Sequence, residues 1–326
     1  MKKISNAPLL KWTGSKRFQA KAIVDYFPKE INTYYECFLG GGSVLHELLN
    51  KIAEGKIKCK NIVCCDINKD LISIFNIFLN NRQSLFDYYC EQRKELVKRS
   101  GFNEEIEKEF TREHTKNCQT LYYENREKYN TIDINNPERP YLFYWLSRTC
   151  FNGLIRFNPK GKFNASFHVG GKLGITPTEL QDVFDSWGYV IDKMNGNIKF
   201  INDSFHNIVK NAKEGDVVYM DPPYENTTGM YFCEKFDTNL LYSVIRNIES
   251  NGAKVLLSYD GFTGNENRTA NVPTDIYKYH TYIKSTRSSF KLLKSNSTGQ
   301  SKTDDVSDSL YLSYVPKIKE PIVKLF

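Results

Sequence analysis

One short segment constrains this chain more than any other: an apolar run at residues 216–220, followed directly by Asp221-Pro222-Pro223-Tyr224. The run is typical of a buried parallel strand. In open α/β sheets, ligands bind at the carboxyl ends of such strands. The segment therefore predicts that an acid, two prolines and an aromatic ring stand at a ligand-binding edge. A strand that simply ends in a proline-rich turn is the plainer interpretation.

Each residue of this tetrapeptide has a chemical use at such an edge. The two prolines have a fixed φ and lack an N–H, so they stiffen the turn and leave its carbonyl groups free to face a site. Asp221 and the Pro222 carbonyl can both accept hydrogen bonds from one amino group. Tyr224 offers a ring face on which a planar base can stack.

Two earlier strand ends carry features that suit a nucleoside-like ligand. Gly40, Gly41 and Gly42 stand between an expected strand and an expected helix, where glycine lets the backbone approach a ligand closely. Asp66 ends the next apolar run, and an acid in that place can bind ribose hydroxyls. A G-x-G-x-x-G pattern is missing from this turn, so we do not predict a dinucleotide.

Composition limits the class of protein. The 326 residues suit one large domain, or one domain with an insertion, and 40% hydrophobic residues allow a sizeable core. No apolar run has the length of a bilayer span, and the first residues do not resemble a signal peptide, so we expect a cytoplasmic protein that does not bind membranes. The eight cysteines form no metal-type Cys-x-x-Cys pattern, and we predict no metal.

The net charge of +7 is unevenly distributed. Residues 141–178 and 276–303 contain no acid but carry several lysines and arginines. Basic surface without acidic neutralisation suits a polyanionic partner such as DNA. Ordinary solvated lysines are the alternative, above all for the second segment.

In this order, the motifs resemble those of DNA adenine methyltransferases of the Dam type, in which a D-P-P-Y motif holds the target amine. The opening L-K-W-T-G-S-K resembles the family's L-x-W-x-G-G-K and departs from it only at Ser15. The run at residues 38–43 and Asp66-Ile67-Asn68 resemble its F-x-G-x-G-S and D-I-N motifs. The resemblance implies S-adenosylmethionine as cofactor, bound by Trp12, Lys16, Phe38, Gly40, Gly42, Asp66, Asp203 and Asp221. For Asp203, which ends another expected strand, a simple helix cap is the alternative.

A second segment resembles the target-recognition run of the same family, N-R-x-x-[YF]-N-G-x-x-R-[YF]-N-x-x-G-x-F-N. Residues 154–158 and 163–167 flank Pro159-Lys160-Gly161, which predicts a basic hairpin with interleaved aromatic rings. By the resemblance, Arg156 reads a guanine and Phe151 wedges into the base stack. The family's proline after Phe163-Asn164 is missing here, and a core hairpin with surface lysines is the alternative. The DNA-binding residues implied are Phe151, Asn152, Arg156, Asn158, Lys160 and Lys162.

Together these features predict a Rossmann-like α/β methyltransferase sheet. We expect residues 1–80 and 175–326 to form the catalytic domain, and residues 81–174 to form a helical and hairpin target-recognition insertion. Asp221, Pro222 and Tyr224 are the predicted catalytic residues. The predicted reaction transfers a methyl group from S-adenosylmethionine to N6 of an adenine flipped out of duplex DNA, in a site that contains GAT.

Two other functions stay open on the sequence. An enzyme of this kind can act on cytosine N4, an RNA base or a glutamine side chain, although glutamine enzymes resemble Asn-Pro-Pro-Tyr instead. A non-catalytic DNA-binding module with this fold is the second. The resemblance implies a monomer associated with the nucleoid, and leaves open whether a cognate restriction enzyme is encoded nearby.

Overall fold

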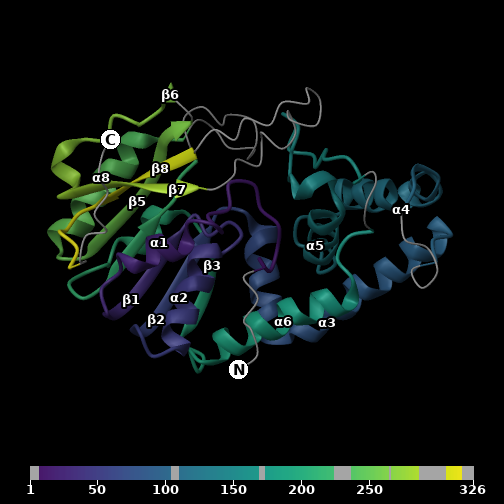
Figure 1. The fold of residues 1–326 in the computed structure, drawn as a ribbon, viewed down its shortest axis with the longest axis horizontal. Helices are drawn as coiled ribbons and strands as arrows, with labels where there is room; N and C mark the ends of the chain where they lie inside the picture. The colour runs from purple at the N-terminus through teal and green to yellow at the C-terminus, as the bar shows by residue number, and fades with distance from the viewer. Residues whose placement is uncertain are drawn as a thin grey trace.

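A mixed sheet forms the centre of the protein (Figure 1). The computed structural model describes residues 7–103, 110–168, 173–223, 236–263, 266–285 and 306–317. The strand order is β3-β2-β1-β4-β5-β8-β7, with the short β6 paired to β5. The strands are β1 (Glu30–Cys37), β2 (Lys58–Asp66), β3 (Ile198–Asn202), β4 (Val217–Met220), β5 (Lys254–Thr263), β6 (Glu266–Asn267), β7 (Tyr279–Ser285) and β8 (Val306–Leu312). The sheet and its flanking helices confirm the predicted α/β class.

The strand predicted before Asp221 is β4, which lies between β1 and β5 and is parallel to both. All four of its residues are buried. Val217 and Tyr219 pack into one hydrophobic cluster, while Val218 and Met220 pack into another. Because both faces of the strand are covered, an unbroken apolar run is what this position requires. The last strand, β8, is antiparallel to both β5 and β7.

Helices cover both faces of the sheet. One face carries α1 (Ala20–Asp25), α2 (Ser43–Ala53), the first part of α3 (Lys69–Ser100) and α6 (Pro177–Asp192), and the other carries α7 (Phe205–Val209) and α8 (Thr238–Ser250). The first helix, α1, begins only at Ala20, after Lys16. Lys16 begins a turn instead, in which its carbonyl accepts hydrogen bonds from Gln19 N and Ala20 N. That turn leaves the Lys16 side chain directed away from the helix surface and into the site described below.

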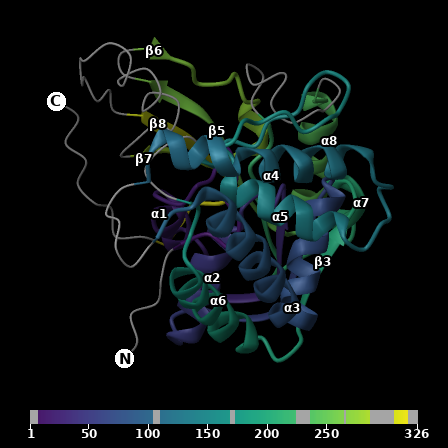
Figure 2. The ribbon, with the colours of Figure 1, turned by 90° about the vertical axis from the view of Figure 1, so that its right-hand side faces the viewer.

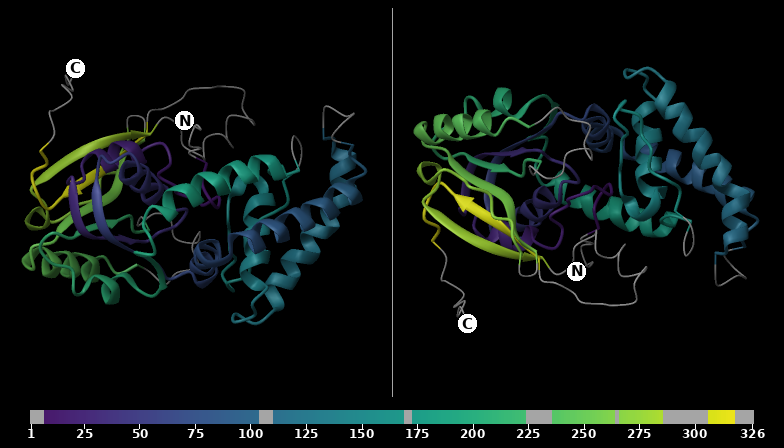
Figure 3. Two further views of the ribbon diagram at one scale, coloured as in Figure 1. Left: turned by 90° about the horizontal axis from the view of Figure 1, so that it is seen from below. Right: turned by 90° about the horizontal axis from the view of Figure 1, so that it is seen from above.

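A helical lobe stands beside the sheet (Figures 2 and 3). It consists of the second part of α3, α4 (Arg112–Thr131) and α5 (Arg139–Thr149). The long α3 is kinked at Asn81, whose φ of −153° and ψ of 64° are not helical. This kink falls at the first boundary that we predicted for the recognition insertion; the insertion's role stays a prediction. Lobe and sheet share one hydrophobic cluster, which contains both Phe143 of α5 and Val217 of β4.

A buried ion pair fastens the lobe to the sheet domain. Asp70, in the first turn of α3, accepts hydrogen bonds from Tyr129 Oη at 2.6 Å and from Arg139 Nε at 3.1 Å. The Arg139 guanidinium also lies over the Tyr129 ring, 4.1 Å from its centroid. Since α3 begins directly after Asp66 at the end of β2, Asp70 holds the lobe beside the predicted cofactor edge.

The predicted basic hairpin is present, but its strands are shorter than expected. Only isolated bridges pair its two arms, including Phe157 with Phe163. The reason is an alternative partner: the Asn130 side chain on α4 accepts from Phe163 N at 2.8 Å and donates to Phe163 O at 3.0 Å. At the turn, Asn158 Oδ1 accepts from both Lys160 N and Lys162 N. Asparagine side chains therefore replace part of the backbone hydrogen bonding that we expected between the two arms of the hairpin.

Candidate active site at the carboxyl ends of the strands

The Asp221 carboxylate is held by a lysine from the beginning of the chain. Lys16 Nζ lies 2.9 Å from Asp221 Oδ1, and the two side chains are only 8% and 18% exposed. Burial alone would lower the pKa of Lys16, but the Asp221 and Asp308 carboxylates outweigh burial and raise it. Lys16 is therefore a permanent cation at the end of β4. We predicted it as a cofactor ligand; its pairing with Asp221 was not foreseen.

Two further carboxylates surround Lys16. Asp308 Oδ2, on β8, lies 3.3 Å from Lys16 Nζ. Asp260, near the end of β5, has its pKa raised to about 6 by burial and then by the Asp308 charge. Neither was a predicted site residue. The apolar run that ends in Asp260 was the only available signal, because the approach of β8 cannot be read from local pattern.

The rest of the predicted catalytic tetrapeptide is only partly within the described residues. Pro222 is buried directly after β4, and Pro223 is half-buried. Tyr224 lies outside the described residues, so its stacking role stays a prediction. One strand away, Glu36 is buried on β1 and accepts a hydrogen bond from Tyr34 Oη at 2.7 Å. Burial raises the pKa of Glu36 to about 8, and the sequence analysis missed this residue, although an acid within a buried strand is itself a signal.

The glycine turn after β1 is tightly wound around Trp12. Phe38, Gly40 and Gly42 have φ values of 70°, 49° and 67°, which lie in the left-handed region. A Cβ atom on Gly40 would stand 2.8 Å from Trp12 Cδ1, so only glycine fits there without displacing the indole. Trp12 also meets the Phe143 ring edge-on, at 6.4 Å between centroids. The predicted tryptophan and glycines thus meet in one place.

Asp66 completes this turn from the neighbouring strand. Its carboxylate accepts hydrogen bonds from Gly40 N at 3.1 Å and from Asn68 N at 2.9 Å. Burial raises the pKa of Asp66, while those backbone N–H groups oppose the rise. Ser15, where the opening motif departs from the family pattern, bonds through its hydroxyl to that of Ser43 at 2.7 Å. The serine therefore ties the opening segment to the first turn of α2.

Asp203 lies further along the same edge, after β3. It accepts hydrogen bonds from Ser204 N at 2.7 Å and from Asn207 Nδ2 at 2.9 Å, and the Asn207 bond comes first among the causes that lower its pKa. These bonds do not cap a helix, because the N-cap of α7 is Ser204 and its side chain makes no capping bond. The proposed cofactor role of Asp203 stays a prediction. Beside it, the Phe38 ring packs 5.1 Å from the Phe205 ring and 5.6 Å from that of Phe236. The sequence analysis did not predict this aromatic group.

The predicted DNA-binding residues gather on the segment that follows α5. Asn152 adopts a φ of 53° in a short 3-10 turn, next to the half-buried Phe151. Arg156 is exposed and is oriented by Asn164, whose Oδ1 accepts from Arg156 Nε at 3.0 Å. The side chains of Lys160 and Lys162 at the tip are exposed as well. The hairpin thus presents three cations to solvent.

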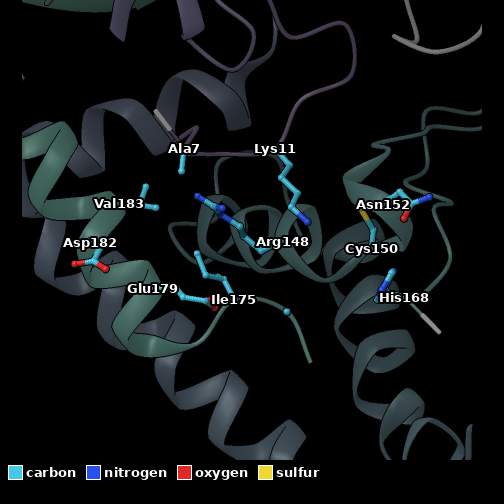
Figure 4. Close-up of a pocket in the computed structure, with 11 residues that line it drawn as sticks. Ala7, Lys11, Arg148, Cys150, Asn152, His168, Ile175, Glu179, Asp182 and Val183 are labelled. Atoms are coloured by element: carbon cyan, nitrogen blue, oxygen red, sulfur yellow. The ribbon is translucent and has the colours of Figure 1, made fainter. Parts of the chain in front are cut away.

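A cavity of about 630 Å³ separates this segment from α6 (Figure 4). Lys11 and Arg148 project into it from one side, and Glu179 and Asp182 line it from α6. Arg148 is buried, and its Nη2 donates to the carbonyls of Pro8 and Leu9. The end of α5 therefore pins the segment that carries Trp12 and Lys16, which connects the predicted recognition hairpin with the site.

The described residues include neither a metal site nor a membrane-spanning helix. Among the residues that the structure describes, no three His, Cys, Asp or Glu side chains gather as ligands for a metal ion. Within the same ranges, no helix combines the length and the apolar character that crossing a bilayer demands.

Comparison with known proteins gives a consistent result. The family model described as D12 class N6 adenine-specific DNA methyltransferase matches residues 12–296. The type II methyltransferase M.MjaIII of Methanocaldococcus jannaschii is 30% identical over 267 residues, which cover 77% of this chain and 83% of that protein. The DNA adenine methylase of Escherichia coli K12 is 32% identical over 220 residues, covering 67% of this chain and 65% of the relative. The type II methyltransferase M1.LlaDCHI of Lactococcus lactis is 28% identical over 267 residues, which cover 78% of this chain and 82% of that protein.

Proposed function

Because this chain belongs to the D12 class of N6 adenine-specific DNA methyltransferases, we propose that it uses S-adenosylmethionine to methylate an adenine flipped out of duplex DNA, in a site that contains GAT. Adenine methylation itself is the activity of the family. The observation that carries the finer proposal is the Asp221 carboxylate, fixed by Lys16 at the end of the central strand. The donor, the base flipping and the residue roles form the rest of the proposal.

Asp221 and the Pro222 carbonyl act on the target amine. The lone pair of an adenine N6 is delocalised into the ring, which makes the nitrogen a poor nucleophile. Two hydrogen bonds from N6 to these acceptors favour a tetrahedral nitrogen with an available lone pair. Since N6 becomes acidic only once it carries the methyl group, Asp221 need not be a strong base. Asp221 acts through its position and its negative charge, and the ion pair with Lys16 determines both.

The turn at residues 38–42 has the features that an adenosine-bearing donor requires. It brings the Trp12 ring and the Asp66 carboxylate to one backbone bend. Each carboxylate oxygen has two lone pairs, so Asp66 can accept from ribose hydroxyls while it holds Gly40 N and Asn68 N. When bound, S-adenosylmethionine supplies a methyl group that its sulfonium charge already activates. Trp12, Phe38, Gly40, Gly42, Asp66 and Asp203 would hold it there, and Lys16 contributes charge beside them.

The recognition hairpin carries the proposed contacts to DNA. An exposed arginine can donate two hydrogen bonds to O6 and N7 of a guanine in the major groove, which is the role we assign to Arg156. Phe151 occupies the proposed wedge position, where an apolar ring fills the stack that the adenine leaves. Asn152, Asn158, Lys160 and Lys162 are proposed to position the backbone of the duplex. No specific observation favours cytosine N4, RNA or a non-catalytic role over this assignment.

Modification sequencing tests the proposal directly. Methyl-free duplex DNA is incubated with the protein and S-adenosylmethionine, with the Asp221→Ala variant run alongside. N6-methyladenine in one short motif with GAT, lost in the variant, is the expected result. Methylation that persists in Asp221→Ala would remove Asp221 from the mechanism, and methylation in a motif without GAT would overturn the assigned site.

A further inference from the structure

We propose that Asp308 is a positioning residue for methyl transfer: it shares the Lys16 ammonium with Asp221 and so sets how strongly that lysine holds the catalytic carboxylate. The inference rests on the proposed role of Asp221. Asp308 belongs to the last described strand, far from both partners in sequence. Its part in the site follows from the arrangement of the sheet.

The geometry places one ammonium between two carboxylates. Lys16 Nζ lies 2.9 Å from Asp221 Oδ1 and 3.3 Å from Asp308 Oδ2, and the Asp308 side chain is only 17% exposed. In a partly desolvated site these interactions are much stronger than on the surface. The position of the ammonium is therefore decided by both acids. Asp308 pulls Lys16 towards β8, while Asp221 pulls it towards β4.

An irregularity in the sheet brings Asp308 to this point. The pairing of β5 with β8 shifts register between Tyr259 and Phe262. Gly261 lies within this shift, and a Cβ there would stand 2.2 Å from Ser307 O. A glycine therefore permits the close approach, and bulges of this kind commonly re-aim side chains beside active sites. Asp308 and Asp260 are the acids on the two strands at this irregularity.

The charged and titratable groups that face this cluster come from five elements. Asp221 and Tyr219 belong to the end of β4, Asp260 to β5, Asp308 to β8, Glu36 to β1 and Arg268 to the segment after β6. At neutral pH Glu36 is largely protonated, and the three carboxylates of Asp221, Asp260 and Asp308 outnumber the cations Lys16 and Arg268. One ammonium thus does not neutralise Asp221 completely, which leaves that carboxylate able to accept hydrogen bonds from the target amine.

Removal of the Asp308 charge changes this balance in a defined direction. In Asp308→Asn the shape is kept, but Lys16 is then attracted mainly to Asp221 and neutralises it more fully. A weaker acceptor activates the amine less, so kcat falls. Because the Asp308 charge helps to raise the pKa of Asp260, the same variant lowers the pKa of Asp260 from about 6. Protonated Asp260 no longer draws Lys16 away from Asp221, so the acid limb of the pH–rate profile should follow this pKa to lower pH.

The test is steady-state methylation by the whole protein across pH 5 to 9, with single-turnover reactions to isolate the chemical step. For Asp308→Asn we expect kcat to fall about ten- to a hundredfold, with KM for S-adenosylmethionine and for DNA within about threefold of the original. We also expect the acid limb to shift to lower pH. Asp308→Glu keeps the charge and should recover most of kcat and the original pH profile.

Asp216→Asn is the matched control. Asp216 is also an aspartate and is buried at the opposite end of β4, where it accepts hydrogen bonds from Thr33 N and Lys213 N. Its loss should lower the melting temperature without moving the pH profile. If Asp308→Asn behaves like this control, Asp308 is structural only and the inference fails. If Asp221→Ala is itself active, the proposed function fails first, so the two failures are distinguishable.

Discussion

The Lys16 ammonium lies 2.9 Å from the Asp221 carboxylate, so the opening segment of the chain and the end of its central strand form one buried ion pair. Arg148 pins the backbone at Pro8 and Leu9, which keeps this segment in place. The contacts run from the predicted recognition region, through α5, to the predicted catalytic acid. An event at the hairpin can therefore reach Asp221 through few side chains.

We expect Lys16→Met to lower the free energy of unfolding by about 3 kcal/mol, because it leaves Asp221, Asp308 and Asp260 together without their cation. Lys16→Arg should keep the fold better but still reduce activity, since a planar guanidinium does not replace a compact ammonium. Denaturant unfolding and single-turnover methylation measure the two effects.

The surface pair Lys51–Asp25 provides the comparison for that loss. Its N–O distance is 3.2 Å, but Asp25 is 52% exposed. Lys51→Met should therefore cost less than about 1 kcal/mol. Equal losses for the two lysines would contradict a special role of burial at Lys16.

Gly40→Ala should weaken binding of S-adenosylmethionine. The alanine must adopt a φ of 49°. Its Cβ would stand 2.8 Å from Trp12 Cδ1, so the indole ring would have to move. The left-handed backbone alone costs about 1 kcal/mol of folding stability. The displaced indole no longer stands where the proposed ligand needs it, so we expect about tenfold weaker binding. Isothermal titration calorimetry with S-adenosylmethionine in the absence of DNA measures this change.

Gly55→Ala separates backbone strain from the Trp12 contact. Gly55 has a φ of 69°, and no heavy atom lies within 4 Å of the Cβ it would carry. The substitution should destabilise the protein slightly and leave the dissociation constant for S-adenosylmethionine unchanged. A parallel loss of affinity in both variants would show that the turn at Gly40 has no particular relation to the ligand.

Arg156→Ala should relax discrimination at one base pair of the recognition site. A bidentate arginine–guanine contact contributes about 1–3 kcal/mol of discrimination, so methylation of sites altered at that guanine should rise relative to the original site. Lys162→Ala is the control, because a phosphate contact weakens all sequences alike and reduces the salt dependence of binding. Unchanged specificity in Arg156→Ala would exclude Arg156 from base reading.

A feature of the fold or the site could be predicted from the sequence where the residues that form it are close together in the chain. The β4 strand and its Asp221, and the glycine turn with Asp66, are local patterns, and the α/β class follows from repeated strand–helix alternation. The Lys16–Asp221 pair and the approach of Asp308 were missed, because they join segments that only the folded sheet brings together. The hairpin was foreseen, but its short pairing was not: Asn130 on another helix satisfies the backbone of Phe163.

Glu36 provides the clearest test by pH, because burial raises its pKa from 4.5 to about 8. A carboxyl group whose folded pKa lies above its unfolded value takes up a proton on folding. The free energy of unfolding should therefore fall as pH rises from about 4.5 to about 8, and the contribution of Glu36 should be constant above that range. The shift corresponds to about 5 kcal/mol at most.

Glu36→Gln removes this slope. The amide oxygen can still accept the hydrogen bond from Tyr34 Oη, and at most one other hydrogen bond is lost, which costs about 1 kcal/mol. The variant should thus be slightly less stable than the original protein near pH 5 and more stable near pH 9, so that the two stability curves cross. Glu30→Gln is the control, because Glu30 is on the same strand but 80% exposed. Thermal unfolding from pH 5 to 9 decides the matter: parallel curves for Glu36→Gln and the original protein would show that Glu36 is charged in the folded protein throughout this range.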